Sequence, residues 1–145
     1  MSSKPEIQLA TDLRTVIARL MKKLRKKSVT GQQLSLTERS SLSLLQQHKE
    51  LLPSELAAME KITNQSMSQI LGHLLELGYI GRKASESDKR KVIISLTPEG
   101  EKTLMRVRAE RDEWLLKAIS ETCSDEDIEA LKQAIAPLAK LVDFE

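Results

Sequence analysis

Apolar residues recur at intervals of three and four near the beginning of the chain, between residues 7 and 27. This spacing places them on one face of an α-helix. Pro5 stands where a first-turn proline is tolerated, and the run Thr30-Gly31-Gln32-Gln33 is expected to break the helix. A long helix at the end of a chain is a candidate for packing against a partner subunit.

The same spacing predicts two helices in the last third of the chain. The first is expected to run from Pro98 to about Thr122 with Thr97 as its N-cap, because proline and threonine favour these positions. The second follows Ser124 and the acidic residues after it. Pro137 lies inside this last helix and predicts a kink or an early end.

Shorter elements are predicted in the middle of the chain. One helix is expected to start with Thr37 as its N-cap and to end near His48, and Leu51-Leu52 predicts a minimal strand. A short helix then covers residues 54–59, with Ser54 as its cap.

A longer amphipathic helix follows the turn at residues 60–63. Its cap is Thr63 or Asn64, it runs to about Leu77, and Gly78 is the kind of residue that commonly ends a helix. The apolar stripe contains Met67, Ile70, Leu71 and Leu74. The other face carries Gln65, Ser66, Ser68, Gln69, Gly72 and His73.

Two short strands come next, over residues 79–84 and 92–96, joined by a polar loop. The whole pattern predicts a mainly α fold with a small β-hairpin wing (α+β), which is a winged helix-turn-helix between N- and C-terminal helices. The expected regions, all within one compact domain, are residues 1–33, 34–98 and 99–145.

Composition narrows the class of protein. A length of 145 residues suits one domain, and 40% hydrophobic with 30% charged residues indicates a folded, soluble chain. Aromatic residues make up only 2%, so a stacking platform for single-stranded nucleic acid is not expected. Cys123 is the single cysteine, and the sequence has neither a signal segment nor a membrane span, so a cytoplasmic protein is expected.

Charge is unevenly distributed, although the net charge is only +2. Basic residues gather between Arg14 and Lys27 and again between Arg82 and Lys91, whereas the chain from Glu121 onward is acidic. Such separation indicates an anionic partner for part of the surface. A solvated helix face is the alternative explanation of a charge run.

The helix pair over residues 54–59 and 64–77 has the layout of a DNA-reading unit. A major groove admits one helix, whose front end meets the base edges and whose free N–H groups favour phosphate. An ordinary amphipathic helix with a polar outer face is the alternative.

The hairpin loop favours the DNA-reading interpretation. Arg90 suits the narrow, negative minor groove, and Asp88 can hold its guanidinium by a paired hydrogen bond. A solvated turn is the alternative, but it would not explain why this hairpin directly follows a helix-turn-helix.

The run from Leu34 to Gly100 resembles the MarR family of bacterial transcription regulators. The most specific part is Asp88-Lys89-Arg90-Lys91 followed by Ile94-Ser95-Leu96-Thr97-Pro98-Glu99-Gly100. Further matching residues are Leu36-Thr37, Glu55-Leu56-Ala57, Leu74, Leu77-Gly78-Tyr79-Ile80 and Arg82. The flanking helices have suitable lengths, so the resemblance covers nearly the whole chain.

The resemblance implies a homodimer in which the first helix and the last two helices of each subunit interlock. Two winged modules would then contact successive major grooves, about 34 Å apart, on a pseudo-palindromic operator in double-stranded DNA. The implied DNA-binding residues are Ser54, Thr63, Asn64, Gln65, Ser66, Ser68, Gln69, His73, Arg82, Asp88, Lys89, Arg90 and Lys91. Many members have a basic residue at the positions of Gln69 and His73, where this chain has weaker donors.

The resemblance further implies a repressor that is relieved by a small aromatic or phenolic ligand between the DNA lobe and the dimer lobe. A winged-helix module that binds a protein, as an antirepressor does, is the alternative. No enzyme activity and no cofactor are expected, because no phosphate loop or nucleophile–base arrangement occurs. No metal site is expected, because His48, His73 and Cys123 lie far apart in the sequence.

Overall fold

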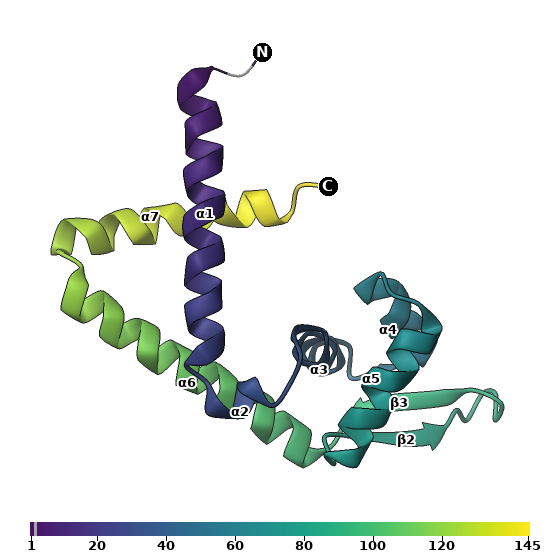
Figure 1. Cartoon of the computed structure of the whole chain (residues 1–145). Helices are drawn as coiled ribbons and strands as arrows, with labels where there is room; N and C mark the ends of the chain where they lie inside the picture. Colours follow the sequence, from purple (N-terminus) through teal and green to yellow (C-terminus); the bar gives the residue numbers. More distant parts are fainter. Residues whose placement is uncertain (2) are drawn as a thin grey trace.

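The computed structural model describes Met1 and residues 3–145, which form a mainly helical fold with a small sheet (Figure 1). In chain order the elements are α1 (Lys4–Lys26), α2 (Val29–Gln32), α3 (Leu36–His48), β1 (Glu50–Leu51), α4 (Pro53–Glu60), α5 (Asn64–Glu76), β2 (Ile80–Ala84), β3 (Val92–Leu96), α6 (Pro98–Thr122) and α7 (Asp125–Val142). The predicted fold class is confirmed.

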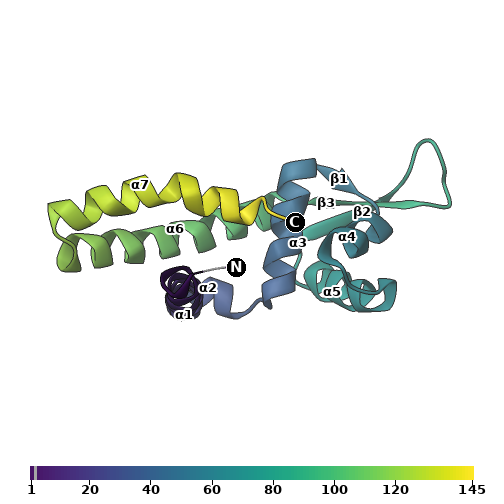
Figure 2. The ribbon, with the colours of Figure 1, turned by 90° about the horizontal axis from the view of Figure 1, so that it is seen from above.

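Two lobes are visible in Figures 1 and 2. The sheet, α4 and α5 form one lobe, while α1, α7 and the second half of α6 form the other. The first half of α6 and the helices α2 and α3 lie where the lobes meet. The position of the sheet and α5 relative to the long helices is therefore set at this junction.

The three strands form an antiparallel sheet in the order β1-β3-β2. Strands β2 and β3 pair from Ile80 opposite Leu96 to Ala84 opposite Val92. The loop that joins them extends away from the helices as a narrow hairpin (Figure 2). The minimal strand β1 starts at Glu50, one residue before its predicted position.

Helix α1 begins before the apolar pattern because Ser3 caps it. The N–H of Glu6 donates to the Ser3 hydroxyl, and the N–H of Ser3 donates to the Glu6 carboxylate at 2.8 Å. Pro5 lies in the first turn, as predicted. The predicted break after α1 contains the one-turn helix α2, in which the N–H of Gly31 donates to Ser28 Oγ at 2.9 Å.

Two predicted helix caps are wrong. Ser35, not Thr37, caps α3, because only Ser35 has a glutamate at the third helical position to complete a reciprocal pair. The N–H of Glu38 donates to Ser35 Oγ at 3.1 Å, and the N–H of Ser35 donates to Glu38 Oε1 at 2.8 Å. Helix α4 begins at Pro53, so Ser54 lies inside its first turn.

The two C-terminal helices begin where the sequence predicts. Thr97 caps α6 at Pro98, and Ser124 caps α7. Of the two outcomes predicted for Pro137, a kink or an early end, the early end does not occur, since the helix continues to Val142. A proline inside a helix removes one backbone donor, and a helix can continue past this loss.

The hydrophobic core lies in the lobe that contains the sheet. Its most deeply buried apolar side chains, each at most 1% exposed, are Leu42, Leu45, Leu56, Met67, Leu74 and Ile94. They come from α3, α4, α5 and β3, and all are aliphatic or methionine. The scarcity of aromatic residues is thus matched by an aliphatic core.

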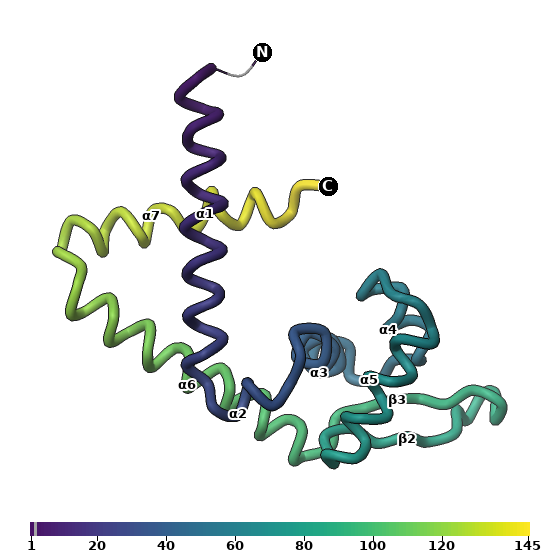
Figure 3. Tube along the Cα trace, viewed as in Figure 1, coloured from purple at the N-terminus to yellow at the C-terminus, as the bar shows by residue number. Residues whose placement is uncertain are grey.

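The long helices α1 and α7 lie away from the sheet, α4 and α5 (Figure 3). Neither helix contains a buried residue in the part of the chain that the structure describes. Both nevertheless carry large apolar side chains that are exposed, namely Ile7, Leu9, Val16, Ile17, Leu20, Met21, Leu131, Ile135, Leu141 and Val142. Within Met1 and residues 3–145, no helix combines the length and apolar character that crossing a bilayer requires.

Candidate nucleic-acid interface

The turn between α4 and α5 fixes where α5 begins. Lys61 adopts a left-handed backbone conformation with φ of 57°, which reverses the chain after α4. The N–H of Ile62 then donates to the carbonyl of Ala57 at 3.0 Å. Thr63 caps α5, since its Oγ1 accepts the N–H of Ser66 at 3.0 Å. Of the two predicted caps, Thr63 is therefore the correct one.

Helix α5 presents a polar surface to solvent and an apolar stripe to the core. Met67, Leu71 and Leu74 are buried, and they anchor the helix against α3, α4 and the sheet. All of the predicted contact residues on this helix are exposed, namely Asn64, Gln65, Ser66, Ser68, Gln69 and His73. Three of these, Gln65, Gln69 and His73, are four residues apart and therefore form one row along the helix.

His73 makes a contact that the sequence did not indicate. Its Nδ1 is hydrogen-bonded to Oε2 of Glu38 in α3. Glu38 is only 6% exposed. Burial alone would raise the pKa of the Glu38 carboxyl, but hydrogen bonds from the Ser35 backbone and from His73 more than offset burial and lower this pKa. The sequence signal that indicates a fixed position for the Glu38 side chain is the capping box, in which Glu38 stands three residues after Ser35.

The wing loop is closed by hydrogen bonds within the hairpin. The N–H of Ser85 donates to the carbonyl of Lys91 at 2.9 Å, and the N–H of Lys91 donates to the carbonyl of Asp88 at 2.9 Å. Arg90 Nε donates to Asp88 Oδ1 at 3.2 Å, and Arg90 Nη2 is 3.5 Å from Oδ2. The predicted contact between Asp88 and Arg90 is confirmed. The Arg90 side chain is 92% exposed, so the guanidinium is both oriented and accessible.

The base of the wing is joined to the neighbouring strand by an ion pair. Lys83 Nζ lies 2.8 Å from Oε1 of Glu50, which links β2 to β1 across β3. The hydrogen bond to Glu50 raises the pKa of Lys83, and the negative charge of the Glu50 carboxylate raises it further. Arg82, the adjacent predicted residue, is exposed on β2 opposite Ile94.

The wing and the front end of α5 meet at a shallow depression. It is lined by Leu52, Pro53, Ser54, Asn64, Lys91 and Val92. The structure therefore brings together three predicted residues, Ser54, Asn64 and Lys91, that are far apart in the sequence. Arg82 and His73 do not line this depression, and Lys89 is exposed at the loop.

Thr97 connects the end of α5 to the start of α6. Its hydroxyl donates to the carbonyl of Gly78 at 2.6 Å and accepts the N–H of Gly100 at 3.1 Å. Its own N–H donates to the carbonyl of Tyr79 at 3.1 Å. Gly78 has φ of 78°, the left-handed conformation in which glycine is least strained. Thr97 thus joins the turn that follows α5 to the first turn of α6 by hydrogen bonds.

Comparison with known proteins identifies the family. The sequence profile of the MarR family matches residues 34–92. The HTH-type transcriptional regulator FarR of Neisseria gonorrhoeae is 34% identical over 102 residues, which cover 70% of this chain and 69% of that protein.

Solved structures agree with this assignment. A putative transcriptional regulator from Pseudomonas aeruginosa superposes with a TM-score of 0.82 at 30% identity, covering 99% of this chain and 100% of that one. A mutant of MepR from S. aureus, bound to an oligodeoxyribonucleotide, shares the fold with a TM-score of 0.71 at 20% identity, covering 92% of this chain and 97% of that one. The chain therefore belongs to the MarR family of transcriptional regulators.

Proposed function

We propose that this DNA-binding regulator is a homodimeric repressor of a pseudo-palindromic operator, and that a small anionic ligand relieves repression. The main support for the proposed DNA contact is the depression that Ser54, Asn64 and Lys91 line together. It makes the front end of α5 and the wing one continuous surface, beside which Arg90 is held by Asp88. The alternative, a module that binds only protein, is not favoured, since the relatives are transcriptional regulators and the MepR structure contains DNA.

The DNA-contacting residues are proposed to divide into two groups. Residues at the front of α5 would meet base edges in a major groove, and Arg90 would enter the adjacent minor groove. Ser54, Thr63, Arg82, Lys89 and Lys91 would contact phosphates, which fixes position without reading sequence. Lys and Arg contacts of this kind make affinity fall as salt rises.

The dimer is proposed to form through residues 1–33 and 99–145. The exposed apolar residues of α1 and α7 support this assignment, because large exposed apolar side chains gathered on a helix mark an interaction surface. The basic residues of α1 and the acidic first turn of α7 offer opposite charges for the same contact. Two-fold symmetry in the protein then requires a pseudo-palindromic operator.

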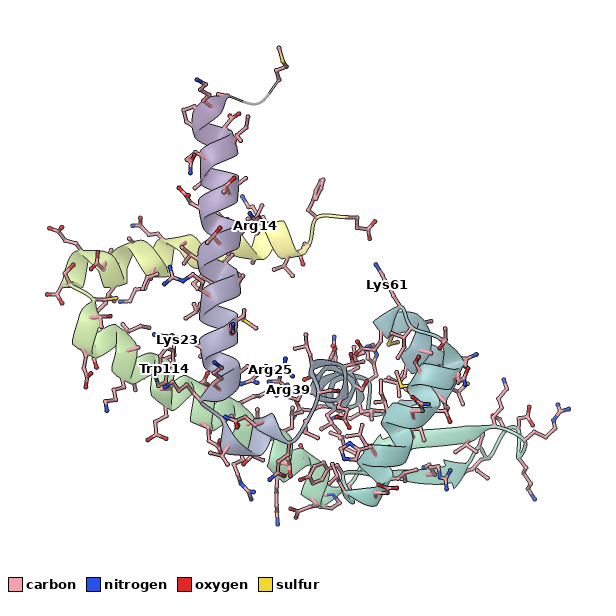
Figure 4. All side chains as sticks on the ribbon, in the orientation of Figure 1. Arg14, Lys23, Arg25, Arg39, Lys61 and Trp114 are labelled. Atoms are coloured by element: carbon pink, nitrogen blue, oxygen red, sulfur yellow. The ribbon has the colours of Figure 1, made fainter. Side chains whose placement is uncertain are left out.

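An anionic ligand is supported by arginine side chains without partners at the junction of the lobes. Among the described residues, Arg39 Nε and Arg111 Nε and Nη2 are buried atoms that make no hydrogen bond. Burial lowers the pKa of Arg111, and the nearby charge of Arg25 lowers it further. Figure 4 shows Arg25 at the end of α1 and Arg39 in the first turn of α3. Buried charge needs a partner, and a carboxylate would supply one.

The first test is a selection of genomic DNA fragments by the purified protein. We expect recovery of fragments that share a pseudo-palindrome with half-sites about one helical turn apart. The measurement is sequencing of bound fragments after washes at increasing salt. An absence of enrichment at low salt would contradict sequence-specific binding and would favour the protein-interaction alternative.

The second test concerns the ligand. Hydroxybenzoates should raise Tm by about 9 °C at a hundredfold excess over their Kd, because binding at this excess stabilises the folded state by about 2.7 kcal/mol. The same compounds should release the selected duplex. Arg39→Met keeps a side chain of similar length and should lose both effects, whereas Lys117→Met, on the surface of α6, should retain them. Equal responses of wild type and Arg39→Met would argue against this site.

A further inference from the structure

The contact between His73 and Glu38 links α5 to a different helix. Within Met1 and residues 3–145 it is the one side-chain hydrogen bond between α3 and α5. Both oxygens of Glu38 are engaged, because Oε1 accepts the N–H of Ser35 and Oε2 contacts His73. With the carboxylate buried and its partners fixed, the imidazole ring has one defined orientation.

That orientation leaves the other side of the ring free. The His73 side chain is 45% exposed, and its Nε2 has no hydrogen-bond partner in the described part of the chain. His73 stands in the exposed row with Gln65 and Gln69. A DNA backbone that lies along this row would therefore meet Nε2.

The chemistry of the ring determines what such a contact requires. A neutral imidazole that donates through Nδ1 has no proton on Nε2, so Nε2 can then only accept a hydrogen bond. A phosphate oxygen also only accepts. The contact consequently forms when the ring is an imidazolium, which donates to Glu38 on one side and to phosphate on the other.

The surrounding charges leave Glu38 as the direct partner. Helix α5 itself carries Glu76 one turn further on, α4 carries Glu55 and Glu60, and β2 carries Arg82 and Lys83. Among the described residues, Glu38 is the one carboxylate within ion-pair distance of His73. Lys83 is paired with Glu50.

We propose that Glu38 is a positioning residue that orients His73 to donate Nε2–H to a DNA phosphate, and that operator binding takes up a proton at this ring. The proposal rests on the proposed DNA interface. Because the complex binds this proton more tightly than the free protein, DNA affinity rises as pH falls.

The test is fluorescence anisotropy with a labelled duplex of the selected motif, at constant salt, from pH 6 to 8. The wild-type Kd should be about tenfold lower at pH 6 than at pH 8, which lies within the limit of about a hundredfold that one proton taken up sets over two pH units. His73→Gln, which keeps a neutral donor, should show a flat profile that meets the wild-type curve near pH 8. His48→Gln is the matched control, because His48 is the only other histidine, and it should keep the wild-type profile.

Glu38→Gln tests the positioning role. With folding verified by circular dichroism, its gain in affinity at low pH should shrink, an effect that a merely structural role would not produce. A wild-type profile in either His73→Gln or Glu38→Gln would overturn the proposal. If selection yields no motif, a random 24-base-pair duplex at low salt serves as the probe. Absence of all binding by the wild type would then overturn the DNA interface itself, which is a distinct result.

Discussion

Gly100→Ala is expected to destabilise the protein by about 3 kcal/mol, which lowers Tm by about 10 °C. A Cβ atom at Gly100 would overlap the carbonyl oxygen of Tyr79 and lie 2.8 Å from its carbonyl carbon. Both are backbone atoms, so no side-chain rotation can relieve the clash. The start of α6 would have to move, and the hydrogen bonds of Thr97 would break. Thermal and urea unfolding followed by circular dichroism measures the loss.

Gly72→Ala is the matched control for this substitution. Gly72 lies within α5, and a Cβ atom there meets nothing within 4 Å. Alanine favours a helix over glycine by about 1 kcal/mol, so this variant should gain stability. Equal stability of Gly100→Ala and wild type would show that the backbone of Tyr79 does not pack against α6 as described.

Arg90→Ala is expected to weaken operator binding by about 1–3 kcal/mol, or roughly 5- to 150-fold in Kd. The guanidinium is exposed and already held by Asp88, so little side-chain freedom is lost when it enters a groove. Because the wing is distant from α1 and α7, the dimer should remain intact. Anisotropy titration gives the affinity, and light scattering gives the oligomeric state.

Two further variants separate orientation from charge at the wing. Asp88→Ala keeps Arg90 but lets the arginine side chain move freely. The loss of DNA affinity in Asp88→Ala should therefore be smaller than the loss in Arg90→Ala. Lys117→Ala removes one positive charge from α6 and should change affinity less than twofold. At physiological salt the Debye length is about 8 Å, so charges further from the DNA than this are largely screened. An Arg90→Ala protein that binds the operator like wild type would exclude the wing contact.

Much of the fold was predictable because its signals are local. The left-handed Gly78 ends α5 where the sequence predicts, and Thr97 with Pro98 starts α6. The cap Thr37 was wrong because Ser35 stands two residues before it, and Glu38, three residues after Ser35, decides between the two. The cap Ser54 was wrong because the neighbouring Pro53 starts α4, which leaves Leu52 as the N-cap without a side-chain hydrogen bond.

The polar contacts of the site were not predictable in the same way. Glu38 and His73 are 35 residues apart, and no pattern in the sequence around either residue predicts their contact. Arg39 looks like a surface residue in the sequence, yet only 7% of it is exposed because α3 is enclosed at the junction of the lobes. Contacts between helices depend on their crossing geometry, which apolar spacing does not determine.

The exposed apolar faces of α1 and α7 make the proposed regulator depend on its own abundance. Helices with no fully buried residue in their own chain would gain stability from a second copy, so folding and assembly would be linked by mass action. When the protein is scarce, the concentration of dimers would fall more steeply than the total concentration of chains. Occupancy of the operator would then respond to expression more steeply than in proportion.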